Sequence, residues 1–449
     1  MNGPFAQAAL NRPHAQRLRL NTARTADIPT PATEPTVAVL GLGYVGLPTS
    51  LALSAAGHGV IGIDISEHRL AEIRAERADL LPSDRARLSE ALDSPYFHLT
   101  TDVSAMEHAN AIVICVPTPV NADLTPDLRF VRAACESAVR HAGIGQTIVL
   151  TSTTYVGTTR ELLIEPLEAR GFTVGENIFV AFSPERIDPG NVHDENGVPR
   201  VIGAATDACA VNAAAVLSTT ASHVHMVGSC EAAELTKLYE NTFRAVNIAL
   251  ANEMAAVSKT FGLDPIEVTQ AAATKPYGFM AHYPGAGVGG HCIPCDPHYL
   301  LAGVHERGER APLIEQAMSA IADRPTTVAT RAAEILGDDG VHIDDARILI
   351  VGAAYKPGVR DVRESPALEI IDELREAGAN VSFTDALVHE VRTGDGATLA
   401  SVGSPEPADY DLVVVVTVHP EADHGWLRRA ARVLDCTYRT HAGERRHTV

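Results

Sequence analysis

The sequence has little positive charge, few aromatic side chains and no regular cysteine spacing. Its 36 Lys and Arg stand against 56 Asp and Glu, a formal net charge of −20. We therefore expect neither nucleic acid nor an acidic membrane surface as a partner, because both attract basic proteins. The seven cysteines are scattered, which indicates reduced thiols in the cytoplasm rather than a disulfide framework. No apolar run approaches the roughly 20 residues of a membrane span.

The length of 449 residues and the 46% hydrophobic content are typical of a protein of two or three domains with a large core. Residues 1–33 differ from the rest, since they carry several arginines, no acidic residue before Asp27 and no apolar run. They lack the apolar core of a signal peptide. We expect a disordered extension here, with a short docking helix as the alternative.

Residues 36–64 predict a β-α-β unit that binds a dinucleotide. An apolar strand leads into the turn Gly41-x-Gly43-x-x-Gly46, a helix follows, and a second strand ends at Asp64. Gly41 permits a tight turn, Gly43 lets a pyrophosphate approach, and Gly46 lets the helix pack closely. The helix N-terminus then faces the phosphates. Asp64 can bind a ribose diol and would repel a 2′-phosphate, so NAD is favoured over NADP; a glycine turn without a ligand is the alternative.

Further strands of the same domain end in prolines and polar residues. These ends carry Pro117 and Thr118, Thr153 and Thr154, and Glu185 and Arg186. Ligands of a doubly wound sheet lie outside the carboxyl ends of its strands, so Thr118 and Thr153 are candidates for the crevice. Threonines in such places can instead cap helices, Thr154 among them. The two charged residues would open on the same crevice, unless they form a solvated loop.

A helix of about 30 residues without proline follows, and it is apolar on more than one face. We expect it to be buried between domains or against a second subunit. Lys237 and Asn241 are four residues apart and Arg244 follows one turn later, so the three share a face. A polar row on a buried helix needs a partner. Either Glu234 and Glu240 neutralise it, or a ligand does.

Residues 284–297, PGAGVGGHCIPCDP, place Cys292 where glycines leave the backbone open. A thiolate there could attack a carbonyl carbon. Cys292 and Cys295 could instead be a redox or metal half-site, or two small buried residues. No second cysteine pair with suitable spacing exists to complete a zinc site, so no metal is expected.

A second α/β unit begins near residue 347, after a helical stretch over 311–336 with a possible break at Pro325. The predicted fold class is α/β, with two Rossmann-like doubly wound α/β domains joined by a long central helix and a helical connector. The expected divisions are 1–33, 34–227, 228–325 and 326–449. The loop after the first strand of the second unit carries Lys356, Arg360 and Arg363. These residues could contact a phosphate or sugar, or the loop could be a solvated turn.

Seven motifs, in this order, resemble those of the nucleotide-sugar 6-dehydrogenases, the family of UDP-glucose and UDP-N-acetylhexosamine dehydrogenases. They are GLGYVGLP, CVPTP, STTYVGT, FSPERIDPGN, ELTKLYENTFR, GVGGHCIPCDP and AYKPGVRDVRESPA. The resemblance covers nearly everything from Thr36 onward. SPERIDPGN, KLYENTFRAVNIA and GGHCIP are more similar to the branch that oxidises UDP-N-acetylmannosamine or UDP-N-acetylglucosamine than to UDP-glucose enzymes.

The resemblance implies a four-electron oxidation that carries the C6 hydroxymethyl of a nucleotide sugar to a carboxylate with two NAD. Cys292 would attack the intermediate aldehyde, and the resulting thiohemiacetal would be oxidised to a thioester and hydrolysed. Lys237 and Asn241 would stabilise the alkoxide and the oxyanion. Asp296 would serve the water or orient Lys237, and Thr153 would hold the water together with Glu185.

The same resemblance implies the binding residues and the assembly. The cofactor site would comprise Gly41, Gly43, Tyr44, Val45, Gly46, Asp64, Arg69, Pro117, Thr118 and Thr153. The UDP-sugar site would comprise Glu185, Arg186, Lys237, Asn241, Arg244, Gly289, Lys356 and Arg363. Residues 326–449 would form the UDP-sugar-binding domain, and the long helix would pair with its equivalent in a homodimer or a higher homo-oligomer.

Three departures and three other functions remain beside this interpretation. Cys295 takes a position that varies in the family and is expected to pack; an oxidised pair with Cys292 would inactivate the enzyme. The region RADLLPSDRARL lacks the pattern of many relatives, and residues 1–33 have no counterpart. A UDP-glucose 6-dehydrogenase is the nearest alternative. A two-electron hydroxyacid dehydrogenase is another alternative, but it would have no use for Cys292 or for the second α/β domain. A non-catalytic nucleotide-binding protein is the third, but it would need an altered reactive centre.

Overall fold

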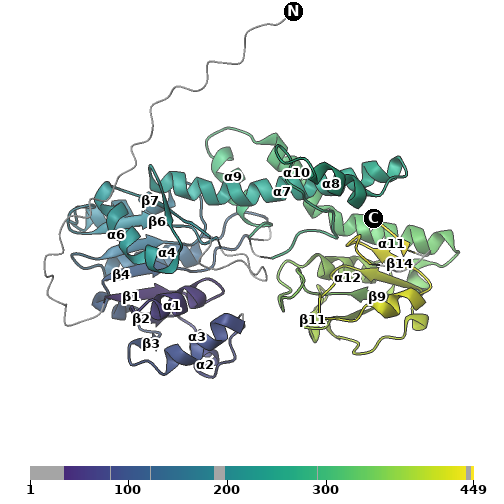
Figure 1. The fold of residues 1–449 in the computed structure, drawn as a ribbon, viewed down its shortest axis with the longest axis horizontal. Helices are drawn as coiled ribbons and strands as arrows, with labels where there is room; N and C mark the ends of the chain where they lie inside the picture. The colour runs from purple at the N-terminus through teal and green to yellow at the C-terminus, as the bar shows by residue number, and fades with distance from the viewer. Residues whose placement is uncertain (1–34, 81, 122, 187–197, 291, 441–445) are drawn as a thin grey trace, which may run out of the picture. The chain divides into compact units, whose positions relative to one another are not determined.

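The computed structural model describes residues 35–80, 82–121, 123–186, 198–290, 292–440 and 446–449 (Figure 1). The extension predicted for residues 1–33 lies outside these ranges. Within them, the helices and strands form two α/β domains with a helical region between them in the chain.

Among the described residues, eight strands form the sheet of the first domain in the order β3-β2-β1-β4-β5-β6-β7-β8. The strands are β1 (Thr36–Leu40), β2 (Gly59–Ile63), β3 (Phe97–Thr100), β4 (Ala111–Ile114), β5 (Thr147–Leu150), β6 (Phe179–Phe182), β7 (Arg200–Ala204) and β8 (Val224–Val227). Neighbours pair in parallel except β6 and β7, which are antiparallel. The chain reverses its direction of growth between β1 and β4, the place where such sheets bind dinucleotides.

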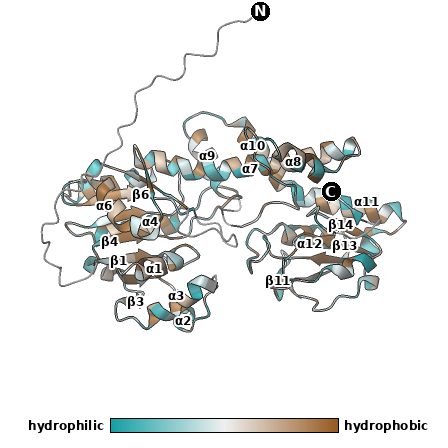
Figure 2. Cartoon of the chain, viewed as in Figure 1, coloured by the Kyte–Doolittle hydropathy of each residue, from teal (hydrophilic) through white to brown (hydrophobic). Residues whose placement is uncertain are grey.

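Helices cover both faces of this sheet, so its central strands are apolar throughout rather than alternating. The helices are α1 (Gly46–Ala55), α2 (Glu67–Arg74), α3 (Pro82–Leu92), α4 (Arg129–Arg140), α5 (Glu165–Ala169) and α6 (Asp207–Leu217). On one face Ile112 packs with Val131 of α4, and on the other Val37 packs with Leu47 of α1. Brown, hydrophobic strands between helices of mixed colour show the same layering in Figure 2.

The helical region contains α7 (Cys230–Thr260), α8 (Pro265–Ala273), α9 (Asp296–His305) and α10 (Pro312–Ala322). The long helix was predicted, and α7 runs for 31 residues. The Ala245 side chain of α7 packs with Leu301 of α9 and Met318 of α10 in one apolar cluster. None of the helices in the described ranges is long and apolar enough to cross a membrane.

The second domain has a five-stranded parallel sheet among its described residues, in the order β10-β9-β13-β14-β15. Its elements are α11 (Arg324–Asp338), β9 (Arg347–Val351), α12 (Pro366–Glu376), β10 (Asn380–Thr384), β13 (Leu412–Val415), β14 (Val433–Asp435) and β15 (Arg446–His447), and a separate antiparallel pair, β11 (Glu390–Arg392) and β12 (Thr398–Ala400). The predicted break is confirmed, since α10 ends at Ala322 and Pro325 stands in the first turn of α11. The predicted α/β fold class is also confirmed.

Candidate active site

The turn between β1 and α1 has the shape that a pyrophosphate needs. Gly41 has a φ of +85°, and a Cβ at Gly46 would lie 1.7 Å from the Gly41 carbonyl oxygen. At Gly43, in contrast, no described atom lies within 4 Å of the Cβ position, so the backbone is open to a ligand. No side chain in the described ranges caps the first turn of α1, which leaves its N–H groups to an anion. These residues fit NAD.

Asp64, just past β2, is fixed by two backbone donors. Its Oδ2 accepts from the Leu42 N–H and its Oδ1 from the Ser66 N–H, both at 2.9 Å. A carboxylate has about four acceptor positions, so two hydrogen bonds leave capacity for a ribose. Arg69, which was predicted to bind the cofactor, donates from Nε to the Leu42 carbonyl oxygen at 2.9 Å and thereby supports the loop.

Tyr44 and Arg363 meet at the open side of this loop. The Arg363 guanidinium lies 4.2 Å from the centre of the Tyr44 ring, a cation–π distance. Arg363 is also ion-paired with Asp361 at 2.7 Å, and the Tyr44 hydroxyl donates to Asp79 at 3.1 Å. Arg363, which was predicted to contact the sugar nucleotide, thus lies beside the dinucleotide turn, and its charge also acts on Cys292. Val45, the next residue, is exposed.

The strand ends of the crevice differ in exposure. Pro117 is exposed and Thr118 is buried, whereas Thr153 is half-buried. The Oγ1 of Thr154 is buried and has no hydrogen-bond partner among the described residues. Thr154 therefore caps none of the described helices, and that alternative is wrong.

Lys237, Asn241 and Asp296 form a buried polar group around the α7–α9 contact. Asn241 Nδ2 donates to Asp296 Oδ2 at 2.5 Å, and all three residues are less than a tenth exposed. Burial raises the pKa of Asp296 to about 6, against the lowering effects of Lys237 and the Asn241 hydrogen bond. Near neutral pH this carboxylate can accept a proton and return it.

Cys292 stands next to this group and is the one exposed thiol of the seven cysteines, all of which are described. Although its side chain reaches solvent, the surrounding protein displaces enough water to raise the pKa of the thiol, and Asp296 adds to this. Lys237, Arg363 and Arg244 act in the opposite direction. The Cys292 carbonyl oxygen accepts from the Asp296 N–H at 2.8 Å, which ties the cysteine loop to the start of α9.

Neither acid proposed to neutralise the polar row of α7 pairs with Lys237. Glu234 accepts from the Gly157 N–H at 2.6 Å and from the Thr159 N–H at 2.8 Å, and Glu240 forms an ion pair with Arg186 at 2.7 Å. In the described part of the chain Lys237 makes no hydrogen bond or ion pair, and its charge acts on Asp296 and Cys292. That leaves its ammonium group available to an oxygen of the substrate.

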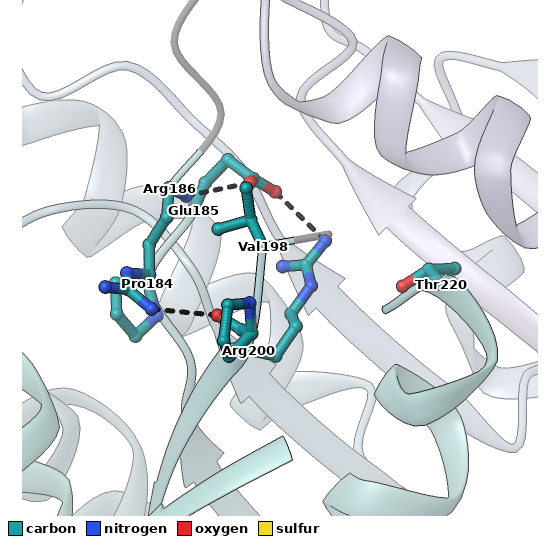
Figure 3. A pocket seen from close by; sticks show the side chains of 7 residues that line it. Pro184, Glu185, Arg186, Val198, Arg200 and Thr220 are labelled. Carbon is teal, nitrogen blue, oxygen red and sulfur yellow. Dashed lines mark hydrogen bonds and ion pairs between the residues drawn. The ribbon is translucent and has the colours of Figure 1, made fainter. Parts of the chain in front are cut away.

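Glu185 and Arg186 lie in a second polar group after β6, drawn in Figure 3. Arg200 Nη2 lies 3.0 Å from Glu185 Oε2, and the Arg186 N–H donates to Glu185 Oε1 at 2.8 Å. The pair of Arg186 with Glu240 connects this loop to α7. Arg200 was not predicted, because an arginine at the start of an apolar strand carries no sequence signal for such a role.

The glycines before Cys292 let another loop approach closely. A Cβ at Gly289 would lie 2.5 Å from the Glu364 carbonyl oxygen and 2.6 Å from the Tyr355 Cβ. The Gly290 N–H donates to the Arg363 carbonyl oxygen at 3.0 Å. Gly289, a predicted substrate residue, thus packs against the loop that also carries the half-buried Lys356. No local sequence pattern indicates this contact between the two loops.

Three family models match consecutive parts of the chain. They are the NAD binding domain of the UDP-glucose/GDP-mannose dehydrogenase family over residues 35–221, its central domain over residues 231–320 and its UDP binding domain over residues 349–439. The prediction of NAD as cofactor is confirmed by the first of these matches.

Curated relatives match over nearly their whole length. A UDP-N-acetyl-D-mannosamine dehydrogenase of Pyrococcus horikoshii is 34% identical over 391 residues, which are 86% of this chain and 90% of that protein. A UDP-N-acetyl-D-glucosamine 6-dehydrogenase of Pseudomonas aeruginosa is 32% identical over 388 residues, with the same two shares.

Solved structures agree with these matches. The UDP-D-ManNAc dehydrogenase of Pyrococcus horikoshii superposes with a TM-score of 0.83 at 30% identity, covering 92% of this chain and 99% of that one. A UDP-glucose dehydrogenase of Pyrobaculum islandicum gives 0.81 at 26% identity, covering 94% and 98%. This chain therefore belongs to the UDP-glucose/GDP-mannose dehydrogenase family and is an NAD-dependent nucleotide-sugar dehydrogenase.

Proposed function

We propose that the enzyme oxidises the C6 hydroxymethyl of a UDP-N-acetylhexosamine to the carboxylate. One hydroxymethyl group, two NAD⁺ and one water give one carboxylate, two NADH and three protons. The observation that carries this proposal is the exposed Cys292 beside buried Lys237, Asn241 and Asp296. A simple alcohol oxidation needs no nucleophile, whereas oxidation of an aldehyde to an acid is eased by a covalent one.

When bound, NAD would take up the two electrons and one hydrogen that leave C6 in each oxidation. Lys237 would hold the C6 oxygen as it gains negative charge, and Asn241 would keep Asp296 oriented. The Cys292 sulfur would bond to the aldehyde carbon, while its proton passes to Asp296 or to a water that Asp296 binds. The second oxidation would leave a thioester on Cys292.

Hydrolysis would complete the reaction. A water oxygen attacks the thioester carbon, the carbon–sulfur bond breaks, and the Cys292 thiolate leaves. We assign the binding of this water to Glu185 and Thr153, which follow the ends of β6 and β5. The released thiolate is then protonated, which restores the resting thiol.

The choice of an acetamido sugar rests on similarity. The motifs SPERIDPGN, KLYENTFRAVNIA and GGHCIP agree with the names of the relatives in Pyrococcus horikoshii and Pseudomonas aeruginosa. A UDP-glucose 6-dehydrogenase that makes UDP-glucuronate is the second candidate, and the similar structure from Pyrobaculum islandicum supports it.

The test is turnover of UDP-N-acetylmannosamine, UDP-N-acetylglucosamine, UDP-glucose and GDP-mannose by the purified enzyme. We expect one of the two acetamido sugars to have the highest kcat/KM. The highest value with UDP-glucose would favour the second candidate. Cys292→Ala should abolish acid formation, and Cys295→Ala, a buried neighbour, serves as the matched control that retains it.

We further propose that the enzyme is a homodimer or a larger homo-oligomer through α7. Large apolar side chains are exposed along α7 and the following turn, namely Leu235, Tyr239, Phe243, Leu250, Met254, Val257 and Phe261. Such a row is typical of an interface. Sedimentation of wild type at micromolar concentration should show a dimer or a larger species, and Leu250→Glu should weaken it; a wild-type monomer would contradict the proposal. Seven free cysteines favour a reducing compartment such as the cytoplasm.

A further inference from the structure

Arg200, the first residue of β7, makes a buried ion pair with Glu185. The two side chains are only 9% and 12% exposed, and Nη2 lies 3.0 Å from Oε2. Burial of a carboxylate is costly without a hydrogen-bonding or charged partner, and Arg200 is that partner here. Its other oxygen is held by the Arg186 N–H at 2.8 Å, so the carboxylate is fixed at both ends.

The pair borders a cavity of about 20 Å³ (Figure 3). The walls are Pro184, Glu185, Arg186, Val198, Pro199, Arg200 and Thr220. Arg200 Nη1 is buried and has no hydrogen-bond partner among the described residues. A cavity needs roughly 10–15 Å³ to hold a water molecule. This one therefore has room for a single water that accepts from Nη1 beside the Glu185 carboxylate.

The pair also lies near the dinucleotide turn. Glu185 and Arg200 both act on the thiol of Cys115, Glu185 raising its pKa and Arg200 lowering it. A Cβ at Gly46 would lie 3.1 Å from the Cys115 Cβ. Both charges therefore act on the residue that follows β4, next to the dinucleotide turn.

We propose that Arg200 is a positioning residue for thioester hydrolysis, which holds the Glu185 carboxylate in its orientation and holds a water next to it. The inference rests on the proposed function of Glu185. In the step it serves, the water oxygen bonds to the thioester carbon, the carbon–sulfur bond breaks, and the water proton passes to Glu185. Arg200 touches neither the sugar nor the reacting carbon.

Arg200→Gln tests this role in the full-length enzyme with the UDP-sugar that is turned over fastest. Removing the charge should slow acid release roughly 100-fold, in the range of a lost general base, while the first oxidation continues. The sugar should then accumulate as a covalent adduct on Cys292, which intact mass spectrometry after rapid quenching detects. Arg200→Lys keeps the charge and should recover part of the rate and lower the adduct.

Arg132→Gln is the matched control, because it removes an arginine of the same domain from an exposed ion pair with Glu161. It should behave as wild type. If Arg200→Gln slows the formation of the first NADH and of the acid equally, and no adduct accumulates, Arg200 has only a structural role and the proposal is overturned. If Arg200→Gln does not fold, Arg200→Lys decides: slowed turnover without adduct overturns it as well. Acid formation by Cys292→Ala would instead refute the proposed function itself.

Discussion

The two α/β domains start in the same way and diverge at one aspartate. In each, a glycine with φ near +85° follows the first strand, Gly41 after β1 and Gly352 after β9. Each glycine donates its N–H to the last residue of the next strand, Gly41 to Ile63 at 2.8 Å and Gly352 to Thr384 at 2.9 Å. Asp64 follows β2, and its counterpart in the second domain follows β10.

That counterpart, Asp385, uses the acceptor capacity of both carboxylate oxygens within the protein. Its Oδ2 accepts from the N–H groups of Ala353 and Ala354 and lies 3.1 Å from His419 Nε2. Its Oδ1 accepts from two more N–H groups, and the side chain is 0% exposed. Asp64 accepts from two backbone donors only among the described residues. The same strand order thus leaves acceptor capacity at Asp64, where we propose that the cofactor ribose binds, whereas Asp385 uses its oxygens to connect parts of the second domain.

The largest effect is expected from Asp385→Ala. Removal of the carboxylate leaves four backbone N–H groups and His419 without their acceptor in a partly buried place, so the free energy of unfolding should fall by about 3–5 kcal/mol. Urea denaturation measures it. Asp64→Ala is the control at the matching position and should cost less than about 1 kcal/mol. Similar losses in the two variants would remove the contrast between the domains.

The reverse contrast is expected in cofactor binding. Asp64→Ala removes a charged acceptor of the ribose, which is worth about 1.5–3 kcal/mol, so the KM for NAD should rise at least tenfold. The KM of Asp64→Asn for NAD should lie between those of wild type and Asp64→Ala. This variant should also use NADP better than wild type, because its side chain no longer repels the 2′-phosphate. Asp385→Asn, assayed where it is folded, should leave the KM for NAD unchanged. An unchanged KM in Asp64→Ala would show that the ribose binds elsewhere.

Acid should separate the two regions further. Hydrogen bonds from His419 and from backbone N–H groups outweigh burial and hold the pKa of Asp385 well below its ordinary value of 3.8. Its contribution to stability is therefore complete above about pH 4 and is lost as the pH falls. Asp296 has its pKa raised from 3.8 to about 6, so its contribution is present below about pH 4 and is lost as the pH rises through 6.

Unfolding free energies between pH 3 and 7 measure both effects. Asp385→Asn should flatten the acid side of the curve, and Asp296→Asn should flatten the part between pH 4 and 6. If Asp385→Asn loses stability on acidification as steeply as wild type, other carboxylates are responsible for the loss of stability in acid. Asp435, whose pKa is also lowered, would then be the first to examine.

Much of the fold could be predicted because its signals are local. The glycine turn, the apolar strands and the proline-free helix each follow from a short stretch of residues. The helix α9 was missed, although Asp296 and Pro297 at its start are typical of a helix N-terminus. The glycines that precede this helix are typical of a loop, and for that reason no helix was predicted after them.

The site was predictable in its residues and less so in their contacts. Cys292, Lys237 and Asp296 do come together, as α7 and α9 pack against each other. The pairing of Arg200 with Glu185 depends on how β6 and β7 align, and the position of Arg363 over Tyr44 depends on contacts between distant parts of the chain. Local sequence patterns indicate neither of these two contacts.

The smallest effect is expected from this last contact. Arg363→Ala removes a cation–π interaction worth about 0.5–1 kcal/mol at a partly exposed site. The KM for NAD should rise about two- to fivefold, with the KM for the UDP-sugar changed less. Tyr44→Phe keeps the ring, loses only the bond to Asp79, and should stay within twofold of wild type. A change confined to the KM for the sugar would contradict this and support the predicted contact of Arg363 with the sugar nucleotide.

The most direct test of the account counts NADH. Wild-type enzyme should consume a limiting amount of its UDP-sugar to completion with two NADH and one UDP-linked acid formed per sugar. The Cys292→Ala variant should form no acid. One NADH per sugar in the wild type, or acid formation without the Cys292 thiol, would contradict the four-electron mechanism on this cysteine.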